Sequence, residues 1–187
     1  MVTSRFLAGG ITDYLATIRE MFRVLTGSGN SYIQVTELRP GLYSDDNSIP
    51  ADAASMKWPR IFFVSGNIGD TLGTSKFDEI ATMLRTRVEA AGFVDIHEFI
   101  DKAPVGNWHP GTFLDENMLK VDPRMNRIGR CLAQGWLGFL AAMRPVMEHI
   151  YGSAAAVDNI IAQVMNDYSN PNYHGYNLMY INPDRIR

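Results

Sequence analysis

The stretch FRVLTGSGNSYIQVTEL, residues 22–38, decides the fold class because it joins three structural signals in one run. Its first part closes a run of apolar residues at helical spacing, and the glycines of TGSGN suit the left-handed backbone that ends a helix. SYIQVTEL then has the β-branched and aromatic content of a strand. The stretch therefore predicts a helix, a glycine turn and a strand, which is a pattern typical of an α/β protein.

Apolar periodicity and turn residues predict the other elements on both sides of this stretch. The expected helices cover residues 12–25 with Thr12 as N-cap, a short apolar segment at 56–72, residues 77–91 closed by Gly92, residues 124–151 with a kink near Pro145, and residues 153–168. The expected strands cover residues 31–38, 93–100 and 173–181, with a fragment at 1–5, and residues 39–59 are expected to form a long loop. We expect one α/β domain, residues 1–187, in which helices predominate.

Composition and charge exclude several classes of function. Among the 187 residues, 46% are hydrophobic and 20% are charged, as in ordinary globular proteins, and a net charge of −3 offers no basic field for nucleic acid. Cys131 is the only cysteine, so neither an intramolecular disulfide nor a cysteine-rich zinc site can form. The first residues lack the pattern of a signal peptide, and no window is apolar enough to span a membrane. We expect a cytoplasmic protein.

Several short motifs occur in an order that resembles one enzyme family. SRFLAGGITDY precedes the opening stretch, EAAGFVDIHEF covers the end of the predicted helix 77–91 and the predicted strand after it, and PVGNW and DPRMNRIGR come later. This order is similar to that of the C-terminal half of class I S-adenosylmethionine-dependent methyltransferases, in the fungal branch associated with secondary metabolism. The resemblance implies a truncated, Rossmann-like methyltransferase sheet of about three to four strands with an enlarged helical cap.

The same resemblance implies that the methyl donor's site is missing. The family binds its donor with a glycine-rich turn after a strand and an acidic residue at the end of the next strand. Gly9 and Gly10 precede a helix, but they lack a full preceding strand and the downstream acid. TGSGN follows a helix and precedes a strand, which is the reverse of the order that aims a helix N-terminus at an anion. We therefore expect no cofactor.

A chain that keeps only the acceptor side of such a domain suits chemistry that needs shape and hydrogen-bond donors. The leading hypothesis is a cofactor-independent cyclase or pericyclase, of the Diels-Alderase type, or an isomerase. Its substrate would be an apolar polyketide or terpenoid intermediate of natural-product biosynthesis. The alternatives are a non-catalytic or complementing subunit of a methyltransferase, and a methyltransferase half whose donor site lies on a partner chain.

The candidate site residues are polar groups near strand ends and apolar side chains that could line a pocket. Glu37 ends the predicted strand at the carboxyl edge, where α/β sheets place ligands. The predicted catalytic residues are Glu37, Tyr43 and His109. The predicted substrate-binding residues are Trp58, Trp108, Trp136, Met143, Asp45, Arg39 and His174.

Simpler explanations exist for most of these residues. The tryptophans and Met143 are equally typical of a hydrophobic core, and His109 of an exposed loop. Tyr43 and Asp45 could belong to a solvated loop. No spacing of histidines and acids predicts a metal site. A half-sheet with an open edge predicts a homodimer in which residues 12–25 and 124–151 bury apolar stripes against a second copy.

Overall fold

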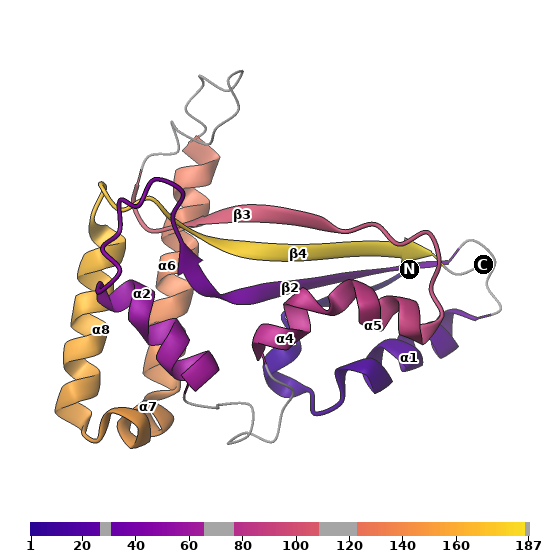
Figure 1. Cartoon of the computed structure of the whole chain (residues 1–187), viewed down its shortest axis with the longest axis horizontal. Coiled ribbons are helices and arrows are strands. Elements are labelled where there is room, and N and C mark those ends of the chain that lie inside the picture. The colour runs from indigo at the N-terminus through magenta and orange to yellow at the C-terminus, as the bar shows by residue number, and fades with distance from the viewer. Residues whose placement is uncertain (27–30, 66–76, 109–122, 186–187) are drawn as a thin grey trace. The chain divides into compact units, whose positions relative to one another are not determined.

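Four strands form one open sheet in which the last strand of the chain lies between the second and the third (Figure 1). The order is β1-β2-β4-β3. β1 (Val2–Arg5) runs parallel to β2 (Tyr32–Tyr43). β4 (Gly175–Arg185) begins close to the end of β2. A Cβ added to Gly175 would lie only 2.9 Å from the Leu42 side chain. This mixed α/β architecture with four strands confirms the predicted fold class.

The computed structural model describes residues 1–26, 31–65, 77–108 and 123–185. The remaining elements are η1 (Ala8–Gly10), α1 (Tyr14–Leu25), α2 (Ala54–Pro59), the π-helix η2 (Arg60–Ser65), α4 (Phe77–Thr82), α5 (Leu84–Ala91), β3 (Phe99–Val105), α6 (Pro123–Ala142), α7 (Arg144–Tyr151) and α8 (Ala154–Ser169). Among these residues, no helix is long and apolar enough to cross a bilayer.

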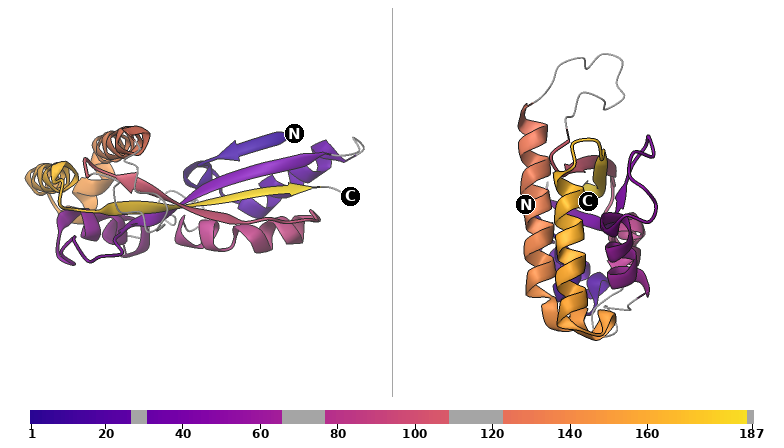
Figure 2. Two further views of the ribbon diagram at one scale, coloured as in Figure 1. Left: turned by 90° about the horizontal axis from the view of Figure 1, so that it is seen from above. Right: turned by 90° about the vertical axis from the view of Figure 1, so that its left-hand side faces the viewer.

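The chain divides into two compact units, each with its own core. Unit 1 consists of residues 1–40, 63–101 and 178–187, and unit 2 of residues 41–62 and 102–177. In unit 1, α1 packs against α5, and both helices lie along its strands (Figure 1). In unit 2, α8 packs against α2, α6 and α7, and α6 and α8 run side by side (Figure 2).

The core of unit 1 joins α1 and α5 to the strands. Ile18, Ile33 and Val88 are fully buried there. The Phe22 ring meets the Phe93 ring edge-on, with centroids 5.1 Å apart. Gly92 ends α5 with φ 103°, a left-handed conformation that favours glycine, and an added Cβ there would lie 3.2 Å from Phe22. Gly92 thus has the helix-ending role that the sequence predicted.

Several predicted boundaries were wrong. Asp13, not Thr12, caps α1, because its side chain accepts a 2.8 Å hydrogen bond from the Ala16 N–H. β2 continues through residues 39–43, which were predicted as loop. β3 starts only at Phe99, and Asp95 before it has φ 53°, which breaks an extended strand.

The predicted long helix is two helices rather than one kinked helix. α6 ends at Ala142 and α7 begins at Arg144, with Met143 between them. Pro145 lies in the first turn of α7, where its missing N–H costs nothing. Within a continuous helix it would remove a hydrogen bond and its ring would clash with the preceding turn. The predicted helix 77–91 is likewise divided at Met83.

Candidate functional site

The candidate site is a group of polar and aromatic side chains in unit 2, gathered where β2 ends, β4 begins and β3 passes. We call it the Asp45 cluster, and it consists of Tyr43, Asp45, Asp46, Lys102, His174 and Tyr176. β2 delivers Tyr43, and the turn after it delivers the two aspartates. β4 runs antiparallel to β2 (Figure 1). Its second residue, Tyr176, and His174 just before it therefore meet the two aspartates.

Asp45 is the acceptor for two donors. The Tyr176 hydroxyl donates to Oδ1 at 2.6 Å, and the Lys102 ammonium donates to Oδ2 at 2.5 Å. The Lys102 Nζ also lies 4.7 Å from the centroid of the Tyr176 ring, which is within cation–π range. The Asp45 and Lys102 side chains are 41% and 39% exposed, so both remain within reach of a ligand.

The charges of these three groups follow from their contacts. The hydrogen bonds from Lys102 and Tyr176 lower the pKa of Asp45, and the bond to Asp45 raises the pKa of Lys102. Burial, followed by the bond to Asp45, raises the pKa of Tyr176. At neutral pH the cluster therefore presents a carboxylate, an ammonium and a neutral phenol. Such a set can bind a carbonyl or hydroxyl oxygen through donors and an acceptor.

Asp46 and His174 form a second pair beside the first. The His174 Nδ1 lies 2.5 Å from the Asp46 Oδ2, and the His174 backbone N–H donates to the Ser48 Oγ at 2.9 Å. The bonds from His174 and Ser48 lower the pKa of Asp46 far below its ordinary value. The contact with Asp46 orients the imidazole, and the backbone bond to Ser48 holds the residue that carries it.

Aromatic packing supports both pairs. The rings of Tyr43 and Tyr176 stack with centroids 6.1 Å apart, and the Trp108 ring lies 5.3 Å from the His174 ring. Trp108 is buried, and its indole N–H donates to the carbonyls of Gly175 and Val105 at 2.8 Å and 3.0 Å. These bonds lock Trp108 in place, so it serves as a fixed wall for His174.

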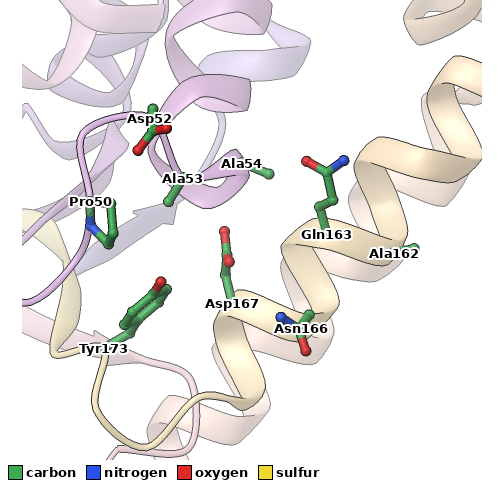
Figure 3. Close-up of a pocket in the computed structure, with 9 residues that line it drawn as sticks. All are labelled: Pro50, Asp52, Ala53, Ala54, Ala162, Gln163, Asn166, Asp167 and Tyr173. Carbon is green, nitrogen blue, oxygen red and sulfur yellow. The ribbon is translucent and has the colours of Figure 1, made fainter.

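A cavity of about 430 Å³ also lies in unit 2, between the segment that leads into α2 and one face of α8 (Figure 3). The residues that line it are Pro50, Asp52, Ala53, Ala54, Ala162, Gln163, Asn166, Asp167 and Tyr173. Figure 3 shows the Asp167 carboxylate pointing toward Ala53 and Ala54, and its Oδ2 accepts a 2.9 Å bond from the Ser55 N–H. Pro50 lies in the segment that follows Asp46, and Tyr173 directly precedes His174, so the cavity and the Asp45 cluster share two chain segments.

Three predicted substrate-binding residues lie in or beside the aromatic core of unit 2. The Trp58 and Trp136 rings meet at 5.3 Å, and Trp58 is 1% exposed. The Trp136 indole N–H donates to the Asn177 Oδ1 at 2.8 Å. Met143 is half-buried between α6 and α7. The tryptophans thus pack against each other, as the core explanation required, and a role in substrate binding stays a prediction.

Glu37 and Arg39 belong to unit 1, whereas the residues of the Asp45 cluster belong to unit 2. Glu37 is 1% exposed, and its Oε1 accepts bonds from the Tyr14 hydroxyl at 2.6 Å and from the Leu7 N–H at 2.9 Å. Burial raises the pKa of Glu37 despite these bonds. Arg39 is half-buried. The bonds from Leu7 and Tyr14 show that Glu37 holds the turn before α1. Catalysis by Glu37 stays a prediction.

The structure therefore brings together Tyr43, Asp45, Trp108 and His174 among the predicted residues. His109 lies outside the described residues. Asp46, Lys102 and Tyr176 were not among the residues predicted from the sequence. The available signal was the adjacent acid pair in YSDDNS. Within the described ranges, no three histidine, cysteine or acidic residues are grouped so as to hold a metal ion.

Comparisons with known proteins give one distant sequence relative. No family model matches the chain. Methyltransferase cpsF of Aspergillus campestris (strain IBT 28561) is 22% identical over 178 residues, which cover 94% of this chain and 56% of cpsF. The chain thus spans about half the length of this curated relative.

Among solved structures, the chain is similar to phosphoethanolamine N-methyltransferase 2 of Haemonchus contortus, in complex with phosphomonomethylethanolamine and S-adenosylhomocysteine. The TM-score is 0.39 at 12% identity, and the match covers all of this chain and 33% of that one. The predicted resemblance is confirmed to the extent of distant sequence similarity to a fungal methyltransferase.

Proposed function

We propose that this chain carries the acceptor-substrate part of a methyltransferase-like enzyme that acts on a small molecule of fungal secondary metabolism. The observation that carries the proposal is the similarity to methyltransferase cpsF, which extends along 94% of the chain and so includes both units. The Asp45 cluster is the proposed acceptor site.

The chemistry of the cluster supports binding rather than strong proton abstraction by Asp45. A carboxylate with a lowered pKa is a weak base, whereas it accepts hydrogen bonds well. Lys102 and Tyr176 keep their protons at neutral pH and remain donors. An oxygen of the acceptor can replace part of the Asp45 contacts, because Lys102 and Asp45 are both partly exposed. The cavity of Figure 3 offers room for the body of a small molecule.

The methyl donor needs a separate test of fit. Contrary to the expectation from the sequence, a short strand and an acid are present: β1, the turn at residues 6–10 and α1 give the strand–turn–helix order of a nucleotide site, with Glu37 on the neighbouring strand. The Glu37 carboxylate, however, is buried and already accepts from Tyr14 and Leu7. An acid committed in this way does not fit the role of binding ribose hydroxyls. We therefore propose that Glu37 does not contact the donor.

A second candidate is the cofactor-independent cyclase, pericyclase or isomerase of a polyketide or terpenoid. The observation that favours it is that one cluster holds a cation, a neutral phenol and a carboxylate next to two stacked tyrosine rings. Donors placed beside a reacting carbonyl stabilise the charge that develops on its oxygen. Such a site needs no second molecule.

Comparison of metabolites distinguishes these candidates. The metabolites of a strain that lacks the protein are compared by mass spectrometry with those of strains carrying the wild type or Lys102→Met. Under the leading proposal, both deficient strains accumulate a compound that is lighter than the product by one methylene. A compound of the same mass as the product would instead indicate the cyclase.

A matched variant separates catalysis from assembly. Lys57→Met removes a lysine that lies outside the Asp45 cluster, and it should restore the product. If Lys102→Met also restores the methylated product while deletion abolishes it, the chain acts as a complementing subunit and the cluster is not its acceptor site. If deletion changes no metabolite, the proposal fails.

A further inference from the structure

We propose that His174 and Asp46 form a proton-accepting dyad that takes the proton of a hydroxyl group on the acceptor. The idea rests on the proposed function, because it names the acceptor's reacting group as an alcohol, enol or phenol. In this arrangement His174 is the catalytic base, and Asp46 is a positioning residue that acts through the imidazole.

The contact between the two side chains selects one tautomer of the imidazole. The Nδ1 of His174 lies 2.5 Å from the Asp46 Oδ2. An ionised carboxylate has no proton to donate, so it can only accept this hydrogen bond. Nδ1 therefore carries the proton in the neutral ring, and Nε2 is left with a free lone pair. Within the residues that the structure describes, Nε2 has no hydrogen-bond partner in the protein.

The aspartate is itself held in place on its other oxygen. The Asp46 Oδ1 accepts from the Ser44 hydroxyl at 2.8 Å and from the Ser48 N–H at 3.0 Å. Ser48 in turn accepts from the His174 N–H. The loop after β2 thus fixes the carboxylate and the imidazole as one unit, so that little reorganisation is needed during proton transfer.

The imidazole is both supported and accessible. Trp108, which is buried and doubly hydrogen-bonded, packs against its ring. The His174 side chain nevertheless remains 33% exposed. A histidine that served only as core would be enclosed, whereas this one presents an edge to a ligand.

The proposed step is balanced by groups of the same cluster. The O–H bond of the acceptor breaks, and its proton forms a new N–H bond on Nε2. The resulting imidazolium is stabilised by the Asp46 carboxylate, and the electron pair stays on the acceptor oxygen. Lys102, the cation of the Asp45 cluster, is the group that stabilises this oxyanion. Loss of a general base of this kind costs on the order of 10²-fold or more in rate.

The tautomer is tested first by long-range ¹H–¹⁵N NMR on histidine-labelled protein. His174→Gln identifies the signals of His174 among those of the four histidines. Neutral His174 should carry its proton on Nδ1. Asp46→Asn should shift the tautomer ratio by roughly tenfold, because a charge-assisted bond is lost, and Asp46→Glu should restore it. Asp158→Asn, which removes an exposed ion-pair partner of Arg144, is the matched control and should change nothing.

The hydroxyl is tested with 4-nitrophenol, whose ionised form absorbs at longer wavelength. Wild-type protein should raise its ionised fraction at constant pH, and His174→Gln should not. His149→Gln, on the exposed His149 of α7, is the control. A proton on Nε2 of neutral His174 overturns the dyad, and equal ionisation with wild type and His174→Gln overturns the hydroxyl as its target. Neither result depends on methyl transfer, so failure of the metabolite comparison remains a separate outcome.

Discussion

The Tyr14 hydroxyl donates a 2.6 Å hydrogen bond to the Glu37 carboxylate, and this bond links α1 to β2 inside unit 1. The same carboxylate oxygen accepts from the Leu7 N–H in the turn after β1. Glu37 is 1% exposed, so its charge has almost no compensation from water. Three segments of unit 1 therefore depend on one buried acid.

Tyr14→Phe should destabilise the protein by about 1–3 kcal/mol, because it removes a donor from a buried carboxylate and leaves that acceptor less satisfied. Urea unfolding at neutral pH measures the change as a lower midpoint. Tyr32→Phe is the control, since Tyr32 is 44% exposed and should tolerate the change. Equal midpoints for Tyr14→Phe and wild type would mean that the bond contributes nothing to stability.

Glu37→Gln should change how stability depends on pH. Burial raises the pKa of Glu37 above its ordinary value. A raised pKa means that the contribution of this acid is fully present below the ordinary carboxyl pKa and is lost as the pH rises through the raised value. The stability of the wild type relative to Glu37→Gln should therefore fall between acidic and neutral pH. Unfolding free energies measured across that range test the sign, and a difference that grows toward neutral pH would contradict it.

Some elements could be predicted from sequence because local and tertiary signals agree. Ser153 accepts from the Ala156 N–H at the start of α8, as an N-cap should. The end of β2 could not be predicted, because Pro40 and Gly41 are typical of loops. β1 pairs with β2 only as far as Thr36, so residues beyond it lie on an open edge where proline is tolerated.

The candidate site was only partly predictable for a related reason. Tyr43, Asp45 and His174 could be selected because they flank predicted strands. Lys102, the partner of Asp45, could not be selected in this way. It lies 57 residues away in sequence, and only the folding of β3 into the sheet brings it to Asp45. Trp58 and Trp136 show the opposite case, in which composition alone cannot distinguish a packed core from a pocket lining.

Two glycines of α6 should respond in opposite directions to alanine. An added Cβ on Gly129 would lie 2.7 Å from the Gly106 carbonyl oxygen, so Gly129→Ala forces backbone apart and should lower stability by about 1–3 kcal/mol. Gly135 has no atom within 4 Å of that position. Gly135→Ala should therefore stabilise the helix by up to about 1 kcal/mol. Thermal unfolding of both variants checks the contrast, and similar melting temperatures would refute this close approach.

The pKa of Tyr176 should move in opposite directions in two variants of the Asp45 cluster. Its pKa is raised first by burial and then by the bond to Asp45, while Lys102 lowers it. Asp45→Asn should lower the pKa of Tyr176, and Lys102→Met should raise it. NMR titration of ¹³C-labelled tyrosine rings gives both values. Unfolding free energies should change by less than about 1 kcal/mol, because the ion pair is partly exposed. Shifts of the same sign would show that the three groups do not interact as described.

We propose that the protein is a homodimer and that unit 1 supplies the contact. The sequence predicted that residues 12–25 and 124–151 bury apolar stripes against a second copy. Within residues 12–25, however, Tyr14, Ile18 and Leu25 are buried in the core of unit 1 itself. The large apolar side chain of α1 that is most exposed is Val24, at 60%. It borders a groove whose lining residues are Val2, Ala16, Thr17, Glu20, Met21 and Val24.

Beside this groove runs β1, which is an edge strand in the order of the sheet. An open strand edge next to apolar side chains is a surface that proteins cover by pairing. Val24→Glu should therefore convert a dimer into a monomer, since two copies of the charge would meet at a two-fold contact. Met165→Glu is the matched control, because Met165 is also exposed but lies on α8 of unit 2. Sedimentation velocity over a hundredfold dilution tests both points. A wild type that sediments as a monomer throughout would contradict the dimer, and a dimer that Val24→Glu leaves intact would place the contact elsewhere.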